Sequence, residues 1–302
     1  MNEKLKGHVL ALLTVTIWGI TYIATKIMLE SYDELQILAL RFIMAYILLW
    51  AVKPKPVKIG SLKDEAGIFA LSLFGVVIYY LLENMALTYS QATNVSILVS
   101  FAPIVTAVGM HITSKNDKLN RYVVLGFFIA IIGVVLVVYN GTVMLKLSPI
   151  GDILSLGATI AWAVYSVLIG RFLKKYDSVI LTRKMFFYTL VLIIPATLIK
   201  SGIPDLTRCF SLDIGLSMLL LGVFGSCLCY LWWNQSIKAL GVVTTTNYVY
   251  LIPFVTMVSA YLLLKEEITI MGFAGAGLII VGVIISDRNT VVKEDDINEE
   301  AV

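Results

Sequence analysis

Long runs of apolar residues dominate the chain, and short polar segments separate them. Each run is close to the ~20 residues that an α-helix needs to cross a bilayer. The pattern therefore predicts ten transmembrane helices, at 8–27, 36–52, 66–87, 94–113, 121–139, 150–170, 180–199, 214–237, 244–264 and 269–286. The connections leave little room for a soluble domain.

The composition narrows the fold class to an all-α membrane protein. The chain has 302 residues, of which 59% are hydrophobic and 14% charged, and its mean hydropathy is +0.90. A soluble domain cannot hide that much apolar surface, because many of its residues always face water. The lipid bilayer is therefore the expected surroundings of most of the chain.

Several function classes lack support in the sequence. The net charge is only +3 and the charges are scattered, which argues against a nucleic-acid partner. Three cysteines and two histidines form no ligand pattern, so we expect no metal and no cofactor. We find no phosphate-binding glycine loop and no catalytic constellation, so we expect neither ATP drive within this chain nor an enzyme.

Lysine and arginine set the expected orientation. Most of them fall in segments on the same side as the N-terminus, and cytoplasmic loops are the ones enriched in these residues. We therefore expect a cell-membrane protein with both termini in the cytoplasm. The acidic end of the chain, residues 289–302, is predicted to be a disordered tail.

An internal repeat divides the chain. Residues 7–33 align without a gap on 151–177, and residues 84–108 align on 234–258. The matched pairs include Trp18 with Trp162, Tyr32-Asp33 with Tyr176-Asp177, Asn84 with Asn234, and Pro103 with Pro253.

Each half holds five predicted spans. Because five is odd, the two halves enter the membrane from opposite sides, and inverted repeats of this kind are typical of secondary transporters with a site near the midplane. We expect ten helices as two inverted five-helix repeats, 1–142 and 149–288, around a central cavity.

These residues resemble the EamA-type families of the drug/metabolite transporter superfamily. The resemblance rests on Trp18-Gly19, on Leu38, Arg41 and Phe42, on "ENMALTYSQATNVSILVSFAPI", and on "ALGVVTTTNYVYLIPF" followed by "KEEITIMGFAGAGLIIVG". It covers about 8–286. It implies a basket in which helices 1–4 and 6–9 line a central cavity while helices 5 and 10 pack outside. It also implies export, less often uptake, of small metabolites such as amino acids.

Glu83 is the first candidate for chemistry. A carboxylate at mid-membrane depth costs about 3 kcal/mol, so it should face a partner or a wet cavity. Tyr79 lies one turn earlier on the same helical face, and Tyr80 stands likewise to Asn84. One interpretation is that Glu83 binds a substrate ammonium group or a coupling proton. The other is a structural anchor paired with Arg41, Lys26 or a backbone amide.

Arg41 has the same two interpretations. Its planar guanidinium suits a substrate carboxylate, but it could equally hold Glu83 or a backbone carbonyl.

Aromatic and amide side chains repeat in both halves and are expected to line the cavity. Small amphipathic solutes need such aromatic walls with a few polar groups. Alternatively, the aromatic residues form interfacial belts and the hydroxyls join helices. The candidate cavity set is Glu83, Asn84, Tyr79, Trp18, Tyr22, Asn94, Ser100, Trp162, Tyr165, Asn234, Asn247, Tyr250 and Arg41.

Pro103 and Pro253 are candidate hinges or static bends, since proline frees a carbonyl within a helix. Small residues on helices 5 and 10, among them Gly126, Gly133 and Gly282, predict close helix packing, which could extend to a homodimer.

The function expected from the sequence is secondary transport of a small metabolite by alternating access, with amino acids first and in the direction of export. The alternatives are a multidrug exporter of cationic compounds and a lipid flippase. A membrane-embedded enzyme would need a chemical cluster, and a sensor would normally carry a soluble output domain.

Overall fold

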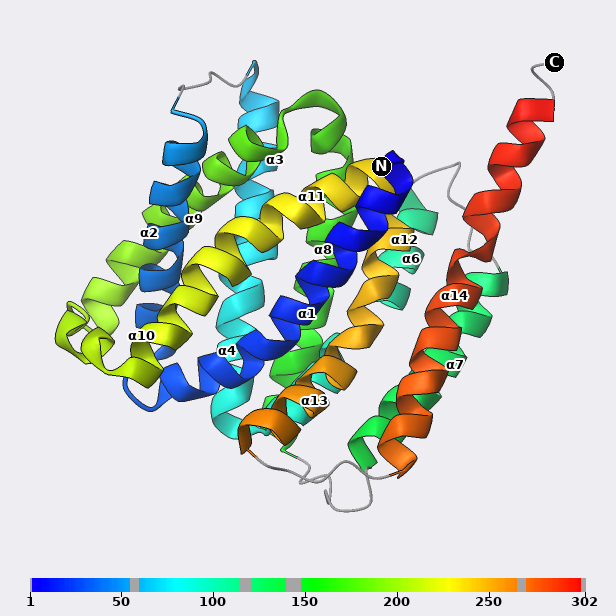
Figure 1. Cartoon of the computed structure of the whole chain (residues 1–302). Coiled ribbons are helices and arrows are strands. Elements are labelled where there is room, and N and C mark those ends of the chain that lie inside the picture. The colour runs from blue at the N-terminus through cyan, green and yellow to red at the C-terminus, as the bar shows by residue number, and fades with distance from the viewer. Residues whose placement is uncertain (1, 55–59, 114–120, 140–147, 265–269, 300–302) are drawn as a thin grey trace.

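A computed structural model describes residues 2–54, 60–113, 121–139, 148–264 and 270–299, without the side chains of 93–94, 137–139, 260, 263–264, 272 and 287–299. Within these ranges the regular structure is entirely helical. Figure 1 shows the helices running side by side, with the start of the first and the end of the last at the same end of the bundle.

Six helices run without interruption: α1 (Glu3–Leu29), α2 (Glu34–Val52), α7 (Arg121–Tyr139), α8 (Pro149–Lys175), α9 (Ser178–Lys200) and α14 (Ile270–Glu299). Four further rods are built from shorter segments, and a 3₁₀ turn, η2 (Leu206–Phe210), precedes one of them. Helical rods are expected in a bilayer because every backbone polar group must find an internal partner.

Within the described ranges, eight rods are long and apolar enough to cross a membrane. They cover 3–29, 34–52, 62–89, 95–113, 149–175, 178–200, 212–240 and 242–259. The helices at the fifth and tenth predicted positions contribute shorter apolar stretches, Arg121–Leu136 and Phe273–Ser286. The described residues are therefore all-helical where they form regular structure, and they have the apolar helices of a multi-pass membrane protein.

Two rods contain a π-helical segment, one in each half of the chain. The first runs as α3 (Leu62–Ser72), η1 (Leu73–Ile78) and α4 (Tyr79–Tyr89). The second runs as α10 (Leu212–Leu219), η3 (Leu220–Leu228) and α11 (Cys229–Leu240). The repeat aligns η1 with the last six residues of η3. Isolated π segments within α-helices often mark functional sites.

The next rod of each half changes its helical geometry at matching positions. The first is α5 (Ala92–Val99) followed by α6 (Ala102–Thr113), with Ser100 and Phe101 outside both helices. The second is α12 (Val242–Asn247), the 3₁₀ turn η4 (Tyr248–Leu251) and α13 (Ile252–Leu264). Pro103 and Pro253 each stand second in the helix after the change, where proline is tolerated. Both prolines therefore mark a bend; a hinge role stays a prediction.

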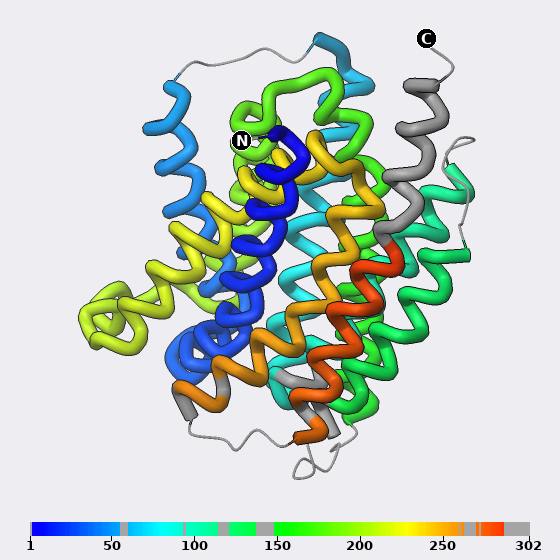
Figure 2. The backbone as a smooth tube through the Cα atoms, turned by 45° about the vertical axis from the view of Figure 1, so that its right-hand side comes forward, coloured from blue at the N-terminus to red at the C-terminus, as the bar shows by residue number. Residues whose placement is uncertain are grey.

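The two halves interlock through exchanged contacts. The first helix of each half packs against the third and fourth rods of the other: α1 on α11 and α13, and α8 on α4 and α6. The remaining helices pair with their own counterparts, α2 with α9 and α7 with α14. Figure 2 shows α7 and α14 side by side at one edge of the bundle.

The pair α7 and α14 approaches closely through glycines, as the sequence predicts. A Cβ on Gly126 would lie 2.1 Å from the Ser286 Oγ, and one on Gly133 would lie 2.6 Å from the Gly275 carbonyl oxygen. The small residues therefore join the two helices within one chain, and the homodimer stays a prediction.

The repeated aspartates cap helices. Asp33 accepts hydrogen bonds from the Leu35 and Gln36 N–H groups at the start of α2. Asp177 accepts them from Val179 and Ile180 at the start of α9. Aspartate is a favoured N-cap because its oxygen satisfies N–H groups that lack helical partners.

The last helix, α14, continues to Glu299. The disordered tail expected over 289–302 stays a prediction.

Candidate functional site

The Glu83 carboxylate lies in the interior of the bundle, on α4. It is 6% exposed, and its Oε1 accepts a hydrogen bond of 2.7 Å from the Tyr79 hydroxyl. The one-turn spacing predicted this shared face. The buried Tyr22 hydroxyl of α1 lines the same cavity and is a second neutral group that interacts with the carboxylate. Glu83 thus faces tyrosine hydroxyls, with no ion pair to a described cation.

Indole and phenol rings surround this carboxylate and come from both halves. Trp18 of α1 meets Trp162 of α8 edge to face, with ring centroids 5.2 Å apart. Tyr79 lies 5.0 Å from Trp162, and Trp233 of α11 lies 5.0 Å from Trp18. We call the space bordered by Trp18, Tyr22, Tyr79, Glu83 and Trp162 the aromatic chamber.

The aromatic chamber is small. Its volume is about 20 Å³, which is room for about one water molecule. Besides the five defining residues, its lining includes Val99 and Ile252, next to the two bends. Among the described residues the centre of the bundle thus holds only this small space between aromatic side chains, and a wider central cavity stays a prediction.

Each π segment accepts a hydrogen bond from a side chain of the other half of the chain. The Tyr230 hydroxyl donates to the Gly75 carbonyl oxygen over 2.7 Å, and the Trp18 indole N–H donates to the Gly225 carbonyl oxygen over 3.0 Å. Gly75 and Gly225 occupy matching positions of the repeat. A chamber residue and a π segment are thus directly linked.

Arg41 does not pair with Glu83. Its Nε donates to the Ser226 Oγ at 2.9 Å, and its guanidinium lies over the Tyr80 ring, 4.2 Å from the centroid. One terminal nitrogen, NH2, has no hydrogen-bond partner among the described residues. Among the described residues no ion pair joins Glu83 to Arg41 or Lys26, and the anchor and binding interpretations of Glu83 both stay predictions.

The matched asparagines differ in their partners. Asn234 accepts from the Tyr165 hydroxyl at 3.3 Å and donates to the Thr182 Oγ1 at 2.9 Å. Asn84 is fully buried, and neither its oxygen nor its nitrogen has a partner among the described residues. The repeat places Leu38 where the second half has Thr182, so the first half lacks the hydroxyl.

We expect Thr182→Val to lower the free energy of unfolding by about 1–2 kcal/mol, because it leaves the buried Asn234 N–H unpaired. Thermal unfolding in detergent micelles measures the change. Thr16→Val is the matched control, since the Thr16 hydroxyl bonds only to the Leu12 carbonyl in its own helix. Equal effects of the two variants would show that the Asn234 bond contributes nothing.

The other predicted site residues are spread out. Ser100 donates to the Ile97 carbonyl at the first bend. Tyr250 packs with Ala130 and Ile279 against α7 and α14, away from the chamber. Asn247 is buried with its Nδ2 unpaired among the described residues. The Asn94 side chain lies outside the described part of the structure.

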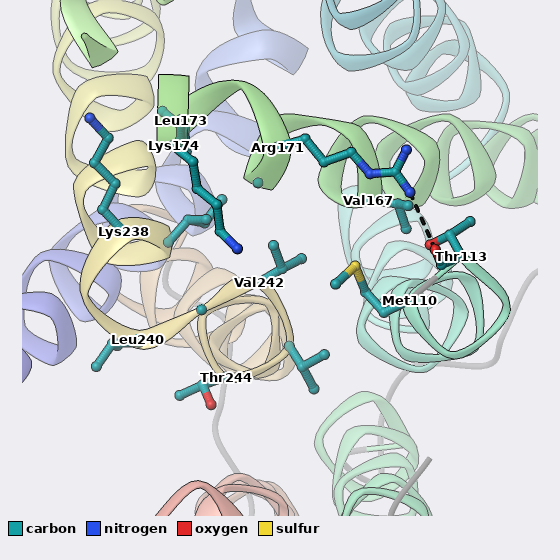
Figure 3. A pocket seen from close by; sticks show the side chains of 14 residues that line it. Met110, Thr113, Val167, Arg171, Leu173, Lys174, Lys238, Leu240, Val242 and Thr244 are labelled. Carbon is teal, nitrogen blue, oxygen red and sulfur yellow. Dashed lines mark hydrogen bonds between the residues drawn. The ribbon is translucent and has the colours of Figure 1, made fainter. Parts of the chain in front are cut away.

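A second, larger cavity was missed by the sequence reasoning. It has a volume of about 810 Å³ and lies at the bundle end that holds the N-terminus, between the ends of α6, α8 and α11 and the start of α12 (Figure 3). Its cations are Arg171, Lys174 and Lys238. The sequence analysis used these three cations only to predict orientation. That they line one cavity depends on how four helix ends pack together, which the sequence does not show.

Known proteins resemble this chain over nearly its whole length. Residues 5–139 and 149–286 each match the model of the EamA-like transporter family. An uncharacterized transporter of Archaeoglobus fulgidus is 30% identical over 290 residues, which span 95% of this chain and 98% of the relative. A protein of Escherichia coli named "Probable amino-acid metabolite efflux pump" is 23% identical over 288 residues, spanning 93% and 94%.

A solved crystal structure shares the fold. It superposes with a TM-score of 0.75 at 16% sequence identity, over 94% of this chain and 97% of its own. The two family matches and the full-length relatives agree with the helical architecture described above. The chain therefore belongs to the EamA-like transporter family, and it is a multi-pass membrane transporter and not an enzyme.

Proposed function

We propose that the protein is a secondary active transporter that moves small metabolites across the cell membrane by alternating access. In this proposal ten helices cross the membrane as two inverted repeats, with both termini in the cytoplasm. The exchanged contacts support it, since α1 meets the third and fourth rods of the second half just as α8 meets those of the first. Rocking of one half against the other would open the aromatic chamber to either side.

The observation that carries the proposal is the buried Glu83 carboxylate in a chamber built by both halves. A carboxylate at this depth is costly to bury, and here it faces neutral tyrosine hydroxyls, of which Tyr79 donates to it over 2.7 Å. Such a group attracts a proton or an ammonium group as soon as water reaches it. The Asn84 amide, unpaired among the described residues, would then gain partners.

The cargo we propose is an amino acid, and the direction is export. The amino group would meet Glu83 and the ring faces of Trp18 and Trp162, which attract cations. The relative named as an amino-acid metabolite efflux pump supports this choice of cargo. Trp18, Tyr22, Tyr79, Asn84 and Trp162 are the contact residues that we propose beside Glu83.

Flux into proteoliposomes tests the proposal. Vesicles that contain the purified chain receive a panel of radiolabelled amino acids, with and without a pH gradient, beside protein-free vesicles. We expect saturable flux of at least one amino acid that responds to the gradient. Flux of an aromatic cation without flux of any amino acid would replace the proposed cargo with cationic compounds. No flux of either class would remove both cargoes.

A further inference from the structure

The large cavity at the N-terminal end of the bundle combines positive charge with an apolar wall. We call it the basic vestibule and define it by Arg171 and Lys174 of α8, Lys238 of α11, and the apolar Met110 and Val243. The fourteen described residues that line it include these three cations and no acidic side chain. Its volume of about 810 Å³ admits a group far larger than a single ion.

The cations reach this space from two helices, α8 and α11, and are only weakly engaged. Figure 3 shows Arg171 extending toward α6, where it donates to the Thr113 carbonyl at 3.3 Å. Lys174 extends toward Val242, and no hydrogen bond or ion pair joins it to another described residue. Lys238 donates to the Tyr176 carbonyl over 3.4 Å. No described carboxylate neutralises any of the three.

The three cations of the basic vestibule have no counterparts in the first half of the repeat. At the aligned positions of the first half, Ile27 stands for Arg171, Glu30 for Lys174 and Thr88 for Lys238. The matching place at the opposite end of the bundle therefore carries no cation at these positions. Basic residues at helix ends often only offset the helix dipole, but here they also border a deep cavity with an apolar wall.

We propose that the basic vestibule binds a phosphate-bearing anion, and that the source is the headgroup of an anionic lipid. Basic pockets between transmembrane helices bind such headgroups, with each cation adding to the attraction. The apolar wall next to the cations favours a lipid over a free ion, because it can meet the first carbons of the acyl chains. This inference concerns binding alone and does not depend on the proposed transport.

Native mass spectrometry of the purified full chain tests it, with phosphatidylglycerol titrated into micelles that contain phosphatidylcholine. We expect the double variant Arg171→Gln/Lys174→Gln to bind phosphatidylglycerol about 25-fold more weakly, about fivefold for each cation. Lys63→Gln is the matched control, since Lys63 is exposed at the same end of the bundle and does not line the vestibule. Its affinity should equal that of the wild type.

A second variant separates the cavity from the charge. Val243→Trp leaves every cation in place but sets a bulky ring against the apolar wall where the acyl chains would lie, so it too should weaken phosphatidylglycerol binding. A parallel titration with inorganic phosphate identifies the source: competition with the lipid at millimolar phosphate would assign the site to a soluble anion instead. Equal lipid binding by the wild type, the double variant and Val243→Trp would overturn the proposal and leave the cations as helix caps.

Discussion

Glu83→Gln is expected to abolish the pH response of transport and to lower flux at least tenfold, without lowering stability. Glutamine has nearly the same shape and its amide oxygen can still accept from Tyr79, so the chamber should keep its packing. It cannot take up or release a proton. Because a carboxylate in the bilayer interior costs about 3 kcal/mol, its removal should leave the melting temperature unchanged or raise it.

Proteoliposome flux and thermal unfolding of the same preparations measure both effects. Glu34→Gln is the matched control, since Glu34 pairs with Lys200 at the end of the bundle and lies outside the chamber. Tyr79→Phe removes the hydroxyl that donates to Glu83 over 2.7 Å and should shift the pH dependence without removing it. A Glu83→Gln protein that unfolds early but still responds to pH would identify Glu83 as a structural anchor.

Gly282→Ala is expected to lower the free energy of unfolding by about 2–3 kcal/mol. The new Cβ would lie 2.7 Å from both the Ala130 nitrogen and the Gly126 carbonyl oxygen. Both are backbone atoms of α7, so no side chain can turn away, and the two helices must separate. Lipid chains provide little drive to hold separated helices together, which makes close packing the main attraction between them.

Gly277→Ala provides the control on the same helix. A Cβ on Gly277 meets no described atom within 4 Å, and alanine favours helix by up to about 1 kcal/mol over glycine. The control should be neutral or stabilising in thermal unfolding. Equal melting temperatures for the two variants would contradict the close contact between α7 and α14.

Much of the fold follows from one-dimensional patterns. Apolar runs predict the helices, and the repeat correctly pairs Trp18 with Trp162 at one chamber and Pro103 with Pro253 at equivalent bends. The four-residue spacing predicts that Tyr79 and Glu83 share a face, and the hydrogen bond between them confirms it. These features are local or symmetric, so the sequence carries them directly.

Other features depend on how distant segments pack. The π segments around Gly75 and Gly225 leave no periodic signal, and their carbonyls find partners on the opposite half. From the sequence, Arg41 could bind a substrate carboxylate, Glu83 or a backbone carbonyl. In the structure it contacts Ser226 and Tyr80 instead. Tyr250 follows the periodicity of a cavity residue but faces α7 and α14, because the 3₁₀ turn η4 alters the helical phase.

The difference between the two halves also bears on how many charges we expect the protein to move in each turnover. The repeat aligns Glu83 with Trp233, whose ring borders Trp18, so the chamber holds one carboxylate among its described lining residues. An assembly of two identical five-helix chains would carry two, and their repulsion in so small a space would oppose closure. After duplication, divergence at one position removes that repulsion. We expect a stoichiometry of one proton or one cationic group per turnover, readable from the reversal potential of the flux.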